Sequence, residues 1–126
     1  MEREVFEEFE ILIQAHPPSE LYDGSLSMLL DLYRFFQTNA DLCAAFLGGN
    51  GDMSFFNKLI GLLRERVFEF WLQERKKDPE QFDYFFSFIA SGCIGMIREW
   101  FNREMRETPE QMAAMTEQLV LYGMGR

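Results

Sequence analysis

Apolar residues along this chain recur every three or four positions, and no segment alternates apolar and polar residues as a half-buried strand would. A repeat of this length places apolar side chains on one face of a helix. The 126 residues suffice for one domain with a substantial core, and 48% of them are hydrophobic. We therefore predict an ordered, all-α helical bundle that forms a single domain over residues 1–126.

Proline, glycine and capping residues divide this pattern into about six helices. Pro17-Pro18 ends the first helix, because proline disfavours helical geometry in the residue before it. The segments Asp78–Gln81 and Thr108–Gln111 share a start signal: a capping residue, proline at the first helical position, and glutamine three residues after the cap. The predicted helices are Glu2–Ala15, Ser25–Thr38, Asn39–Leu47 with Asn39 as its cap, Met53–Lys76, Pro79–Met105, and a last helix from Pro109 to about Gly123.

The net charge of −9, from 12 basic and 21 acidic residues, argues against nucleic acid as a direct partner. A phosphate backbone repels an acidic surface unless the basic residues are strongly segregated. The two small basic groups, Arg64–Arg66 and Arg75–Lys77, contain or adjoin acidic residues, so we interpret them as solvated helix faces. We place no recognition helix before the first predicted helix, and we expect no specific operator binding by this chain alone.

The cysteines and the N-terminal residues indicate a reduced, cytoplasmic protein. Cys43 and Cys93 each lie in an apolar helical segment, and the first ten residues are acidic and amphipathic, unlike a secretory signal peptide. No apolar run approaches the roughly 20 residues of a membrane-spanning helix. We therefore expect free thiols and no membrane partner.

Three glycines in the segment Leu47–Asp52 raise the question of a phosphate or metal loop. A P-loop needs Gly-Lys-Ser/Thr and a preceding strand, whereas here Asp52 follows the last glycine and a predicted helix precedes the loop. A calcium loop of the EF-hand type needs a distal glutamate, but the first acidic residue after Asp52 is Glu65. We interpret the segment as a joint in which a glycine ends one helix and Asp52 caps the next.

The other candidates for chemistry lack partners along the sequence. His16 is the only histidine and lies at the end of the first helix, where we expect packing or capping, with a pocket-lining role left open. The sequence has no Cys/His/Asp/Glu cluster with metal-ligand spacing, no Gly-x-Ser-x-Gly elbow and no Cys–His pair indicated by spacing. We therefore predict no enzyme activity, no metal and no cofactor.

Aromatic and small residues form the strongest remaining pattern. The 14 Phe side chains either pack a core or wall an apolar cavity between helices, and the sequence leaves both open. On the fifth predicted helix, Ser87, Ser91 and Gly95 are four apart and form a strip beside Phe88 and Gly92. Glycine inside a helix costs about 1 kcal/mol relative to alanine, which favours the close approach of another backbone here. We expect this helix to contact something beyond the intrachain core.

Several short motifs occur in a recognisable order. A Phe-rich helix is followed by an Asn-Gly-Asp joint, a Gly-containing helix that ends near Trp, and a Thr-Pro-Glu cap. These motif residues are Asn50-Gly51-Asp52, Phe55, Lys58-Leu59, Gly92, Gly95, Trp100 and Thr108-Pro109-Glu110. Their order resembles the C-terminal regulatory domain of TetR/AcrR-type transcriptional regulators, in the branch that includes the dihydroxyacetone-kinase activator-like regulators. The resemblance extends from about Val5 to Leu121.

The resemblance implies a cytoplasmic homodimer that associates through its last two long helices and binds a small effector in its core. The family also carries an N-terminal helix-turn-helix domain, and only the end of its linking helix, at Glu2–Ala15, matches here. DNA would thus be a partner only through a domain absent from this chain. The predicted pocket residues are Phe9, Phe36, Val67, Trp71, Phe85, Ile89 and Met96. The predicted dimer contacts are Ser87, Phe88, Ser91, Gly95, Met112, Met115, Leu119 and Tyr122.

Two functions follow as hypotheses. The apolar character of the predicted pocket favours a hydrophobic or aromatic effector over a sugar phosphate, and such an effector would modulate DNA binding by the helix-turn-helix domain. The alternative is a ligand-free dimerisation module that pairs with other regulators.

Overall fold

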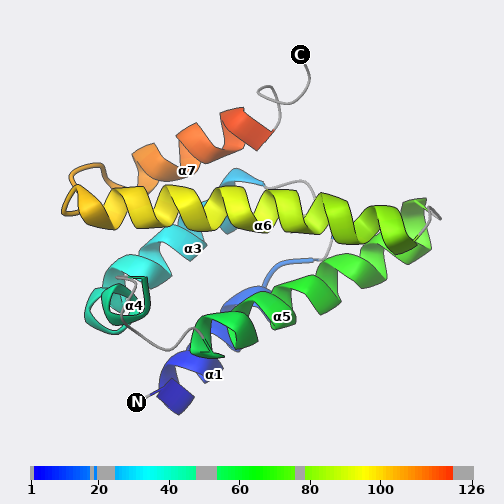
Figure 1. Cartoon of the computed structure of the whole chain (residues 1–126), viewed down its shortest axis with the longest axis horizontal. Coiled ribbons are helices and arrows are strands. Elements are labelled where there is room, and N and C mark those ends of the chain that lie inside the picture. The colour runs from blue at the N-terminus through cyan, green and yellow to red at the C-terminus, as the bar shows by residue number, and fades with distance from the viewer. Residues whose placement is uncertain (1, 18, 20–24, 48–53, 76–78, 121–126) are drawn as a thin grey trace.

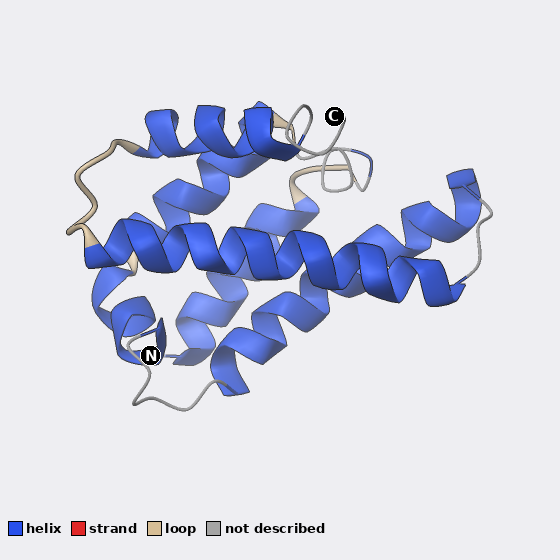
Figure 2. Ribbon diagram, turned by 45° about the horizontal axis from the view of Figure 1, so that its top comes forward, coloured by secondary structure: helices blue, strands red, loops and turns tan. Residues whose placement is uncertain are grey.

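Helices form all the regular structure in the described part of the chain, which comprises residues 2–17, 19, 25–47, 54–75 and 79–120 of this computed structural model. These residues contain no strand, and the predicted all-α fold is confirmed (Figure 2). The elements are α1 (Glu2–Gln14), α3 (Leu26–Thr38), α4 (Ala40–Leu47), α5 (Ser54–Phe70), the π-helical turn η1 (Trp71–Arg75), α6 (Pro79–Asn102) and α7 (Pro109–Gln118).

Helix α6, with 24 residues, crosses the molecule between two groups of helices (Figure 1). Helix α7 lies along one side of it, and α1 and α5 lie on the other. Among the described residues, the most extensive helix pairing is between α7 and α3, and α3 also packs on α1 and α4. Since α7 is seated mainly on α3, its contact with α6 is looser, and this arrangement positions the site described below.

The predicted start of α7 is confirmed in full. The Thr108 hydroxyl accepts a hydrogen bond from the Gln111 backbone N–H at 3.1 Å, and the Gln111 side chain accepts one from the Thr108 N–H at 2.9 Å. This capping box satisfies two backbone donors that the first turn of a helix would otherwise leave unpaired. Ser25 caps α3 by accepting from the Met28 N–H at 3.3 Å. The cap predicted at Asp78, which shares its start signal with Thr108, lies outside the described residues.

Some predicted helix boundaries need correction. The single helix predicted from Met53 is α5 followed by η1. Helix α6 ends at Asn102 and not at Met105, because Glu104 and Met105 have left-handed φ angles of 59° and 52°. The predicted end of the last helix at Gly123 lies outside the described residues.

Asn39 stands between α3 and α4 and serves both helices. The Asn39 amide donates to the Phe35 carbonyl at 3.0 Å and so closes α3. Its backbone carbonyl accepts from the Cys43 N–H at 3.0 Å, as that of the residue before a helix does, and capping of α4 by its side chain stays a prediction.

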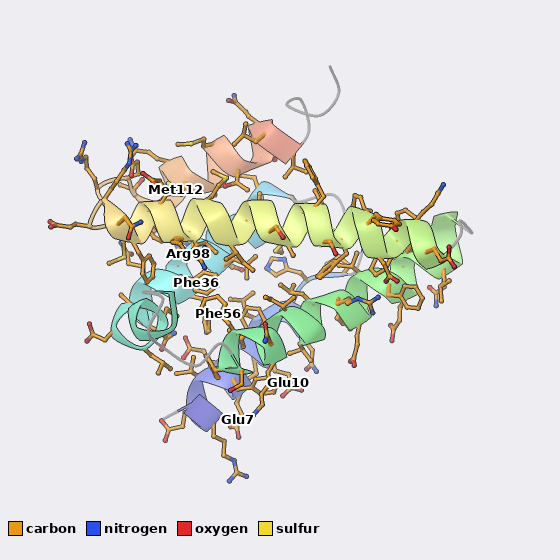
Figure 3. All side chains as sticks on the ribbon, viewed as in Figure 1. Glu7, Glu10, Phe36, Phe56, Arg98 and Met112 are labelled. Atoms are coloured by element: carbon orange, nitrogen blue, oxygen red, sulfur yellow. The ribbon has the colours of Figure 1, made fainter. Side chains whose placement is uncertain are left out.

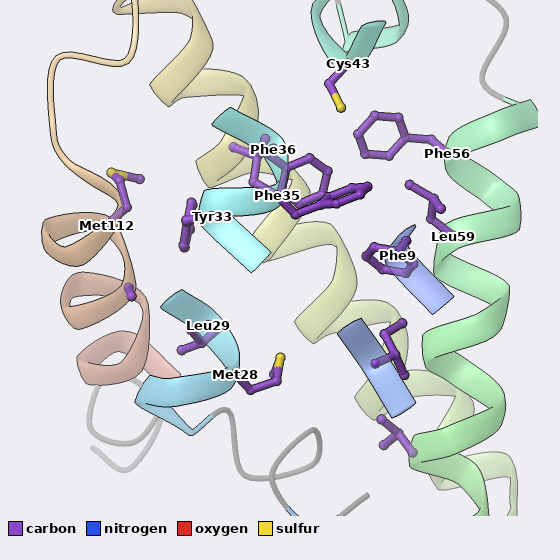
Figure 4. Packing of buried hydrophobic residues seen from close by; sticks show 14 of the residues in the cluster. Phe9, Met28, Leu29, Tyr33, Phe35, Phe36, Cys43, Phe56, Leu59 and Met112 are labelled. Carbon is purple, nitrogen blue, oxygen red and sulfur yellow. The ribbon is translucent and has the colours of Figure 1, made fainter. Parts of the chain in front are cut away.

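Aromatic rings dominate the interior between α1, α3 and α5. The rings of Phe36 and Phe56 stack with centroids 5.8 Å apart, and those of Phe9 and Phe35 lie 5.1 Å apart (Figure 3, Figure 4). Such pairs contribute roughly 0.5–1.5 kcal/mol beyond the burial of their area. The Phe-rich pattern therefore builds a core, which was one of the two interpretations that the sequence left open.

A buried hydrogen bond joins α3 to α7. The Tyr33 hydroxyl lies 2.7 Å from the Thr116 hydroxyl, and Thr116 donates to the Met112 carbonyl at 2.8 Å. Because Thr116 has one hydroxyl proton and uses it on that carbonyl, Tyr33 is the donor in their shared bond. Burial raises the pKa of Tyr33 to about 12, so this donor stays protonated at physiological pH.

We predict that removing Thr116 lowers the free energy of unfolding more than removing the hydroxyl of Tyr33 does. Replacing Thr116 by valine leaves the buried Tyr33 hydroxyl without an acceptor and should lower the free energy of unfolding by about 1–3 kcal/mol. Tyr33→Phe leaves Thr116 bonded to Met112 and should cost only about 1 kcal/mol. The double variant should lose less than the sum of the single losses. Urea unfolding of the three variants measures this, and additive losses would contradict a direct bond.

Candidate functional site

An apolar cavity of about 110 Å³ lies between α1, α3, α5 and α6. Among the described residues, its wall carries no acidic, basic or amide side chain, and the Cys93 thiol is the most polar side-chain group. The lining residues are Phe9, Met28, Leu29, Leu32, Phe36, Phe56, Leu59, Ile60, Leu63, Val67, Phe86, Ile89, Ala90, Cys93, Ile94, Ile97 and Val120. Dry apolar cavities of about 150 Å³ accept benzene, so this one suits a neutral guest of about one ring.

The structure brings together four of the seven predicted pocket residues. Phe9, Phe36, Val67 and Ile89 line the cavity, from α1, α3, α5 and α6 respectively. The other three lie elsewhere. Trp71 and Phe85 belong to an aromatic cluster where η1 meets the start of α6, and Met96 faces α7. That these residues bind an effector stays a prediction.

The aromatic cluster holds α5, η1 and α6 together. Phe82 is its centre, with ring centroids 4.9 Å from Phe68 and 5.4 Å from Trp71. The Arg64 guanidinium lies over the rings of Phe82 and Phe68, 5.4 Å and 5.8 Å from their centroids. It also forms an ion pair with Asp83 on α6. Arg64, which the sequence analysis assigned to a solvated face, therefore bridges α5 and α6.

A second hollow, the α6–α7 groove, lies on the outer side of α6 and measures about 340 Å³. Its lining residues are Phe88, Ile89, Gly92, Cys93, Met96, Thr116, Leu119 and Val120. A Cβ atom placed on Gly92 or Gly95 would meet nothing within 4 Å. Neither glycine is therefore required by packing within the chain, and the close backbone that the sequence analysis expected does not come from this chain's own described residues.

Two of the predicted dimer contacts, Phe88 and Leu119, line this groove. Ser87, Ser91 and Gly95 are exposed on α6, and Phe88 is 58% exposed. On the α7 side, Met115 and Leu119 are 43% and 50% exposed. Met112 is instead buried in the chain's own core, and Tyr122 lies outside the described residues. The exposed members are all apolar or small residues without a charge, and whether they form a dimer contact stays a prediction.

His16 is buried and joins three helices. Its Nε2 lies 2.8 Å from a carboxylate oxygen of Asp31 on α3, and its backbone carbonyl accepts from Arg66 on α5 at 3.1 Å. The packing role expected for His16 at the end of α1 is confirmed, but its partners are distant in sequence. His16 does not line the cavity. In the described ranges, no three His, Cys, Asp or Glu side chains gather closely enough to hold a metal ion.

Both cysteines are free thiols in apolar surroundings. Burial raises the pKa of Cys43 to about 12 and also raises the pKa of Cys93. A thiol that stays protonated is a poor nucleophile and behaves as a small apolar group. Cys93 therefore completes an apolar wall and does not add a reactive group to the cavity.

The comparisons with known proteins agree with this geometry. A family model of the TetR type, described as the transcriptional regulator C-terminal region, matches residues 23–122 and so covers most of the chain. Searches of curated proteins and of solved structures gave no match. None of the helices built from the described residues combines the length and apolar character that crossing a membrane requires.

We predict that Arg64 contributes measurably to stability although it is partly exposed. Arg64→Gln removes a cation from two aromatic faces and should cost roughly 0.5–1.5 kcal/mol of unfolding free energy. The matched control is Arg3→Gln, which removes an ion pair with Glu7 that lies almost entirely in solvent and should change stability little. Thermal unfolding of both variants decides the matter, and equal losses would show that the ring contacts contribute nothing.

Proposed function

Because the chain belongs to the family of TetR-type transcriptional regulator C-terminal regions, we propose that it is the dimerisation and effector-binding domain of a DNA-binding regulator. The effector is a small, neutral, apolar molecule, and the domain passes its presence on to a helix-turn-helix domain that contacts DNA. Within the family we assign the chain to the dihydroxyacetone-kinase-activator-like branch, on the order of its Asn50–Asp52, Trp100 and Thr108–Glu110 motifs.

The uncharged cavity is the observation that carries the effector proposal. Ligand sites are mostly apolar and often lie between bundle helices, as this cavity does. A charged effector would lose its hydration there without gaining a partner, and that loss costs far more than apolar contact returns. Since the cavity touches α1, α3, α5 and α6 at once, a ligand in it stabilises one arrangement of these helices. Coupling of this kind between two sites is typically worth about 1–3 kcal/mol.

The exposed face around the α6–α7 groove supports homodimerisation. Large apolar side chains such as Phe88 and Leu119 stand beside glycines that have open space above them. Large contiguous apolar patches on a protein surface often mark interaction sites, and exposed Phe88, Met115 and Leu119 are the residues that such a patch would use here. Obligate homodimers bury on the order of 2,000 Å² or more in total. The alternative function, a ligand-free module that pairs with other regulators, uses the same face and leaves the cavity empty.

We expect the chain to be a dimer at micromolar concentration and Phe88→Glu to make it a monomer. The added carboxylate would have to be buried without a partner in the interface. Ile11→Glu is the matched control, because Ile11 is 69% exposed on α1, away from this face, and its replacement should leave the dimer intact. Sedimentation velocity separates the two states, and a monomeric unaltered chain would refute the proposal.

We expect neutral one-ring compounds to stabilise the domain. Toluene should raise the melting temperature, since a ligand at 100 times its Kd adds about 2.7 kcal/mol to the stability. Benzoate, which has a similar size but carries a charge, should have no effect at the same concentration. A thermal shift series with both compounds tests the effector proposal. Equal shifts, or none with any neutral apolar compound, would favour the ligand-free alternative.

A further inference from the structure

We propose that the effector of the cavity is an unbranched hydrocarbon chain with one polar end, of the kind that a primary alcohol represents, and not a compact ring system. This inference rests on the proposed function and names the chemical class of its ligand. Three features of the described residues carry it: the length of the cavity, its small volume, and a half-buried rim in its wall.

The cavity is long, because its wall follows whole faces of two helices. On α6 the lining residues run from Phe86 to Ile97 and recur every three or four positions, and on α5 they run from Phe56 to Val67. Residues 86 and 97 are eleven positions apart, as are 56 and 67. Since a helix rises about 1.5 Å per residue, each stripe is about 16 Å long. A single ring fills only part of that length.

Aromatic rings bound this length at both ends. Phe36 and Phe56, which stack with centroids 5.8 Å apart, line one end. Phe86 lines the other end, where α5 and α6 approach each other, and its ring stacks on that of Phe82 at 5.8 Å (Figure 1). A guest can therefore extend along the cavity between the two sets of rings.

The volume over that length is small. The cavity measures about 110 Å³, although its wall extends along α3, α5 and α6. A small volume that is drawn out in this way is narrow, and a close-packed interior does not widen without cost. A branch or a second fused ring needs width, whereas each added methylene of a single chain needs only length. The shape of the cavity therefore favours a chain.

Part of the wall is a rim that reaches the surface. Ile60 and Leu63 on α5 and Ala90 and Ile94 on α6 are half-buried, whereas Phe9, deeper in the wall, is 1% exposed. A hydroxyl group placed against the deep apolar residues would lose water without gaining a hydrogen bond. At the rim the same group stays hydrated. The ligand therefore lies with its chain along the floor and its polar end at the rim.

Primary alcohols of increasing length test this inference by isothermal titration calorimetry on the full chain. Each buried methylene should tighten binding about three- to fourfold, so 1-decanol should bind at least about thirtyfold more tightly than 1-hexanol. The matched isomer is 2-ethyl-1-hexanol, which has the formula of 1-octanol but carries a branch. It should bind roughly tenfold more weakly than 1-octanol, because the branch overpacks a narrow cavity.

The outcomes separate this inference from the proposed function. If toluene stabilises the domain but 1-decanol binds no more tightly than 1-hexanol, the effector site stands and the chain does not. Equal affinity for the two octanol isomers would likewise overturn the inference. If neither toluene nor any of the alcohols binds, the proposed effector site fails, and the inference fails with it.

Ala90→Leu tests where the chain lies. Ala90 is near the middle of the α6 stripe and lines the cavity but not the α6–α7 groove. The larger side chain would interrupt the length of the cavity, so 1-decanol should bind roughly tenfold more weakly, while toluene, which needs only part of the length, should stay within about threefold. The matched control is Ala114→Leu, the same change at an exposed position of α7 outside the lining, and it should alter neither affinity.

A folded Ala90→Leu variant that binds 1-decanol as tightly as the unaltered chain would overturn the inference. Circular dichroism shows whether the variant folds. If it does not, the comparison of the two octanol isomers on the unaltered chain decides.

Discussion

The buried hydrogen bond between Tyr33 and Thr116, together with the buried side chains of α7, holds α7 on α3, and the α6–α7 groove lies beside α7 in that position. The bond is buried and joins residues 83 positions apart, so it forms only when α7 is seated on α3. With α7 fixed there, α6 packs between α7 and the pair of α1 and α5 (Figure 1). The side chains of α6 reach the cavity on one face and the groove on the other. A buried donor without its acceptor would cost about 1–3 kcal/mol, which disfavours any other seating of α7.

The many aromatic residues of the chain pack its core, and this core leaves an apolar cavity unfilled. Stacked and tilted rings fill the centre of the bundle, and a second set of rings holds the start of α6 to η1. Between these two sets the helices leave about 110 Å³ unfilled, and voids of that kind cost stability because their lining atoms lose contacts. The described residues of the cavity wall carry no charge, and this is the basis on which we propose an apolar effector.

Tertiary contacts between distant residues account for what the sequence analysis missed. Arg64 was assigned to a solvated face because its neighbours along the chain are charged, yet it lies over the rings of Phe68 and Phe82. His16 was expected to pack, but its partner Asp31 lies on another helix. Trp71 and Phe85 have the same helical spacing as the residues that line the cavity, but their rings lie 5.4 Å apart in the cluster at the start of α6 and neither lines the cavity. Periodicity assigns a face to each residue but does not say which neighbour covers that face.

The sequence by itself determined the helical class, the order of the helices, the capped start of α7 and a family resemblance that the comparison with known proteins confirms for the regulator domain. These features depend on local geometry: the period of the apolar residues, and hydrogen bonds that Thr108 and Gln111 form within one turn. Only the tertiary structure decided that Ile89 and Cys93 face both hollows and that Met112 is buried. Helices can be packed in several rotations about their axes, and long-range packing together with one buried hydrogen bond selects among them.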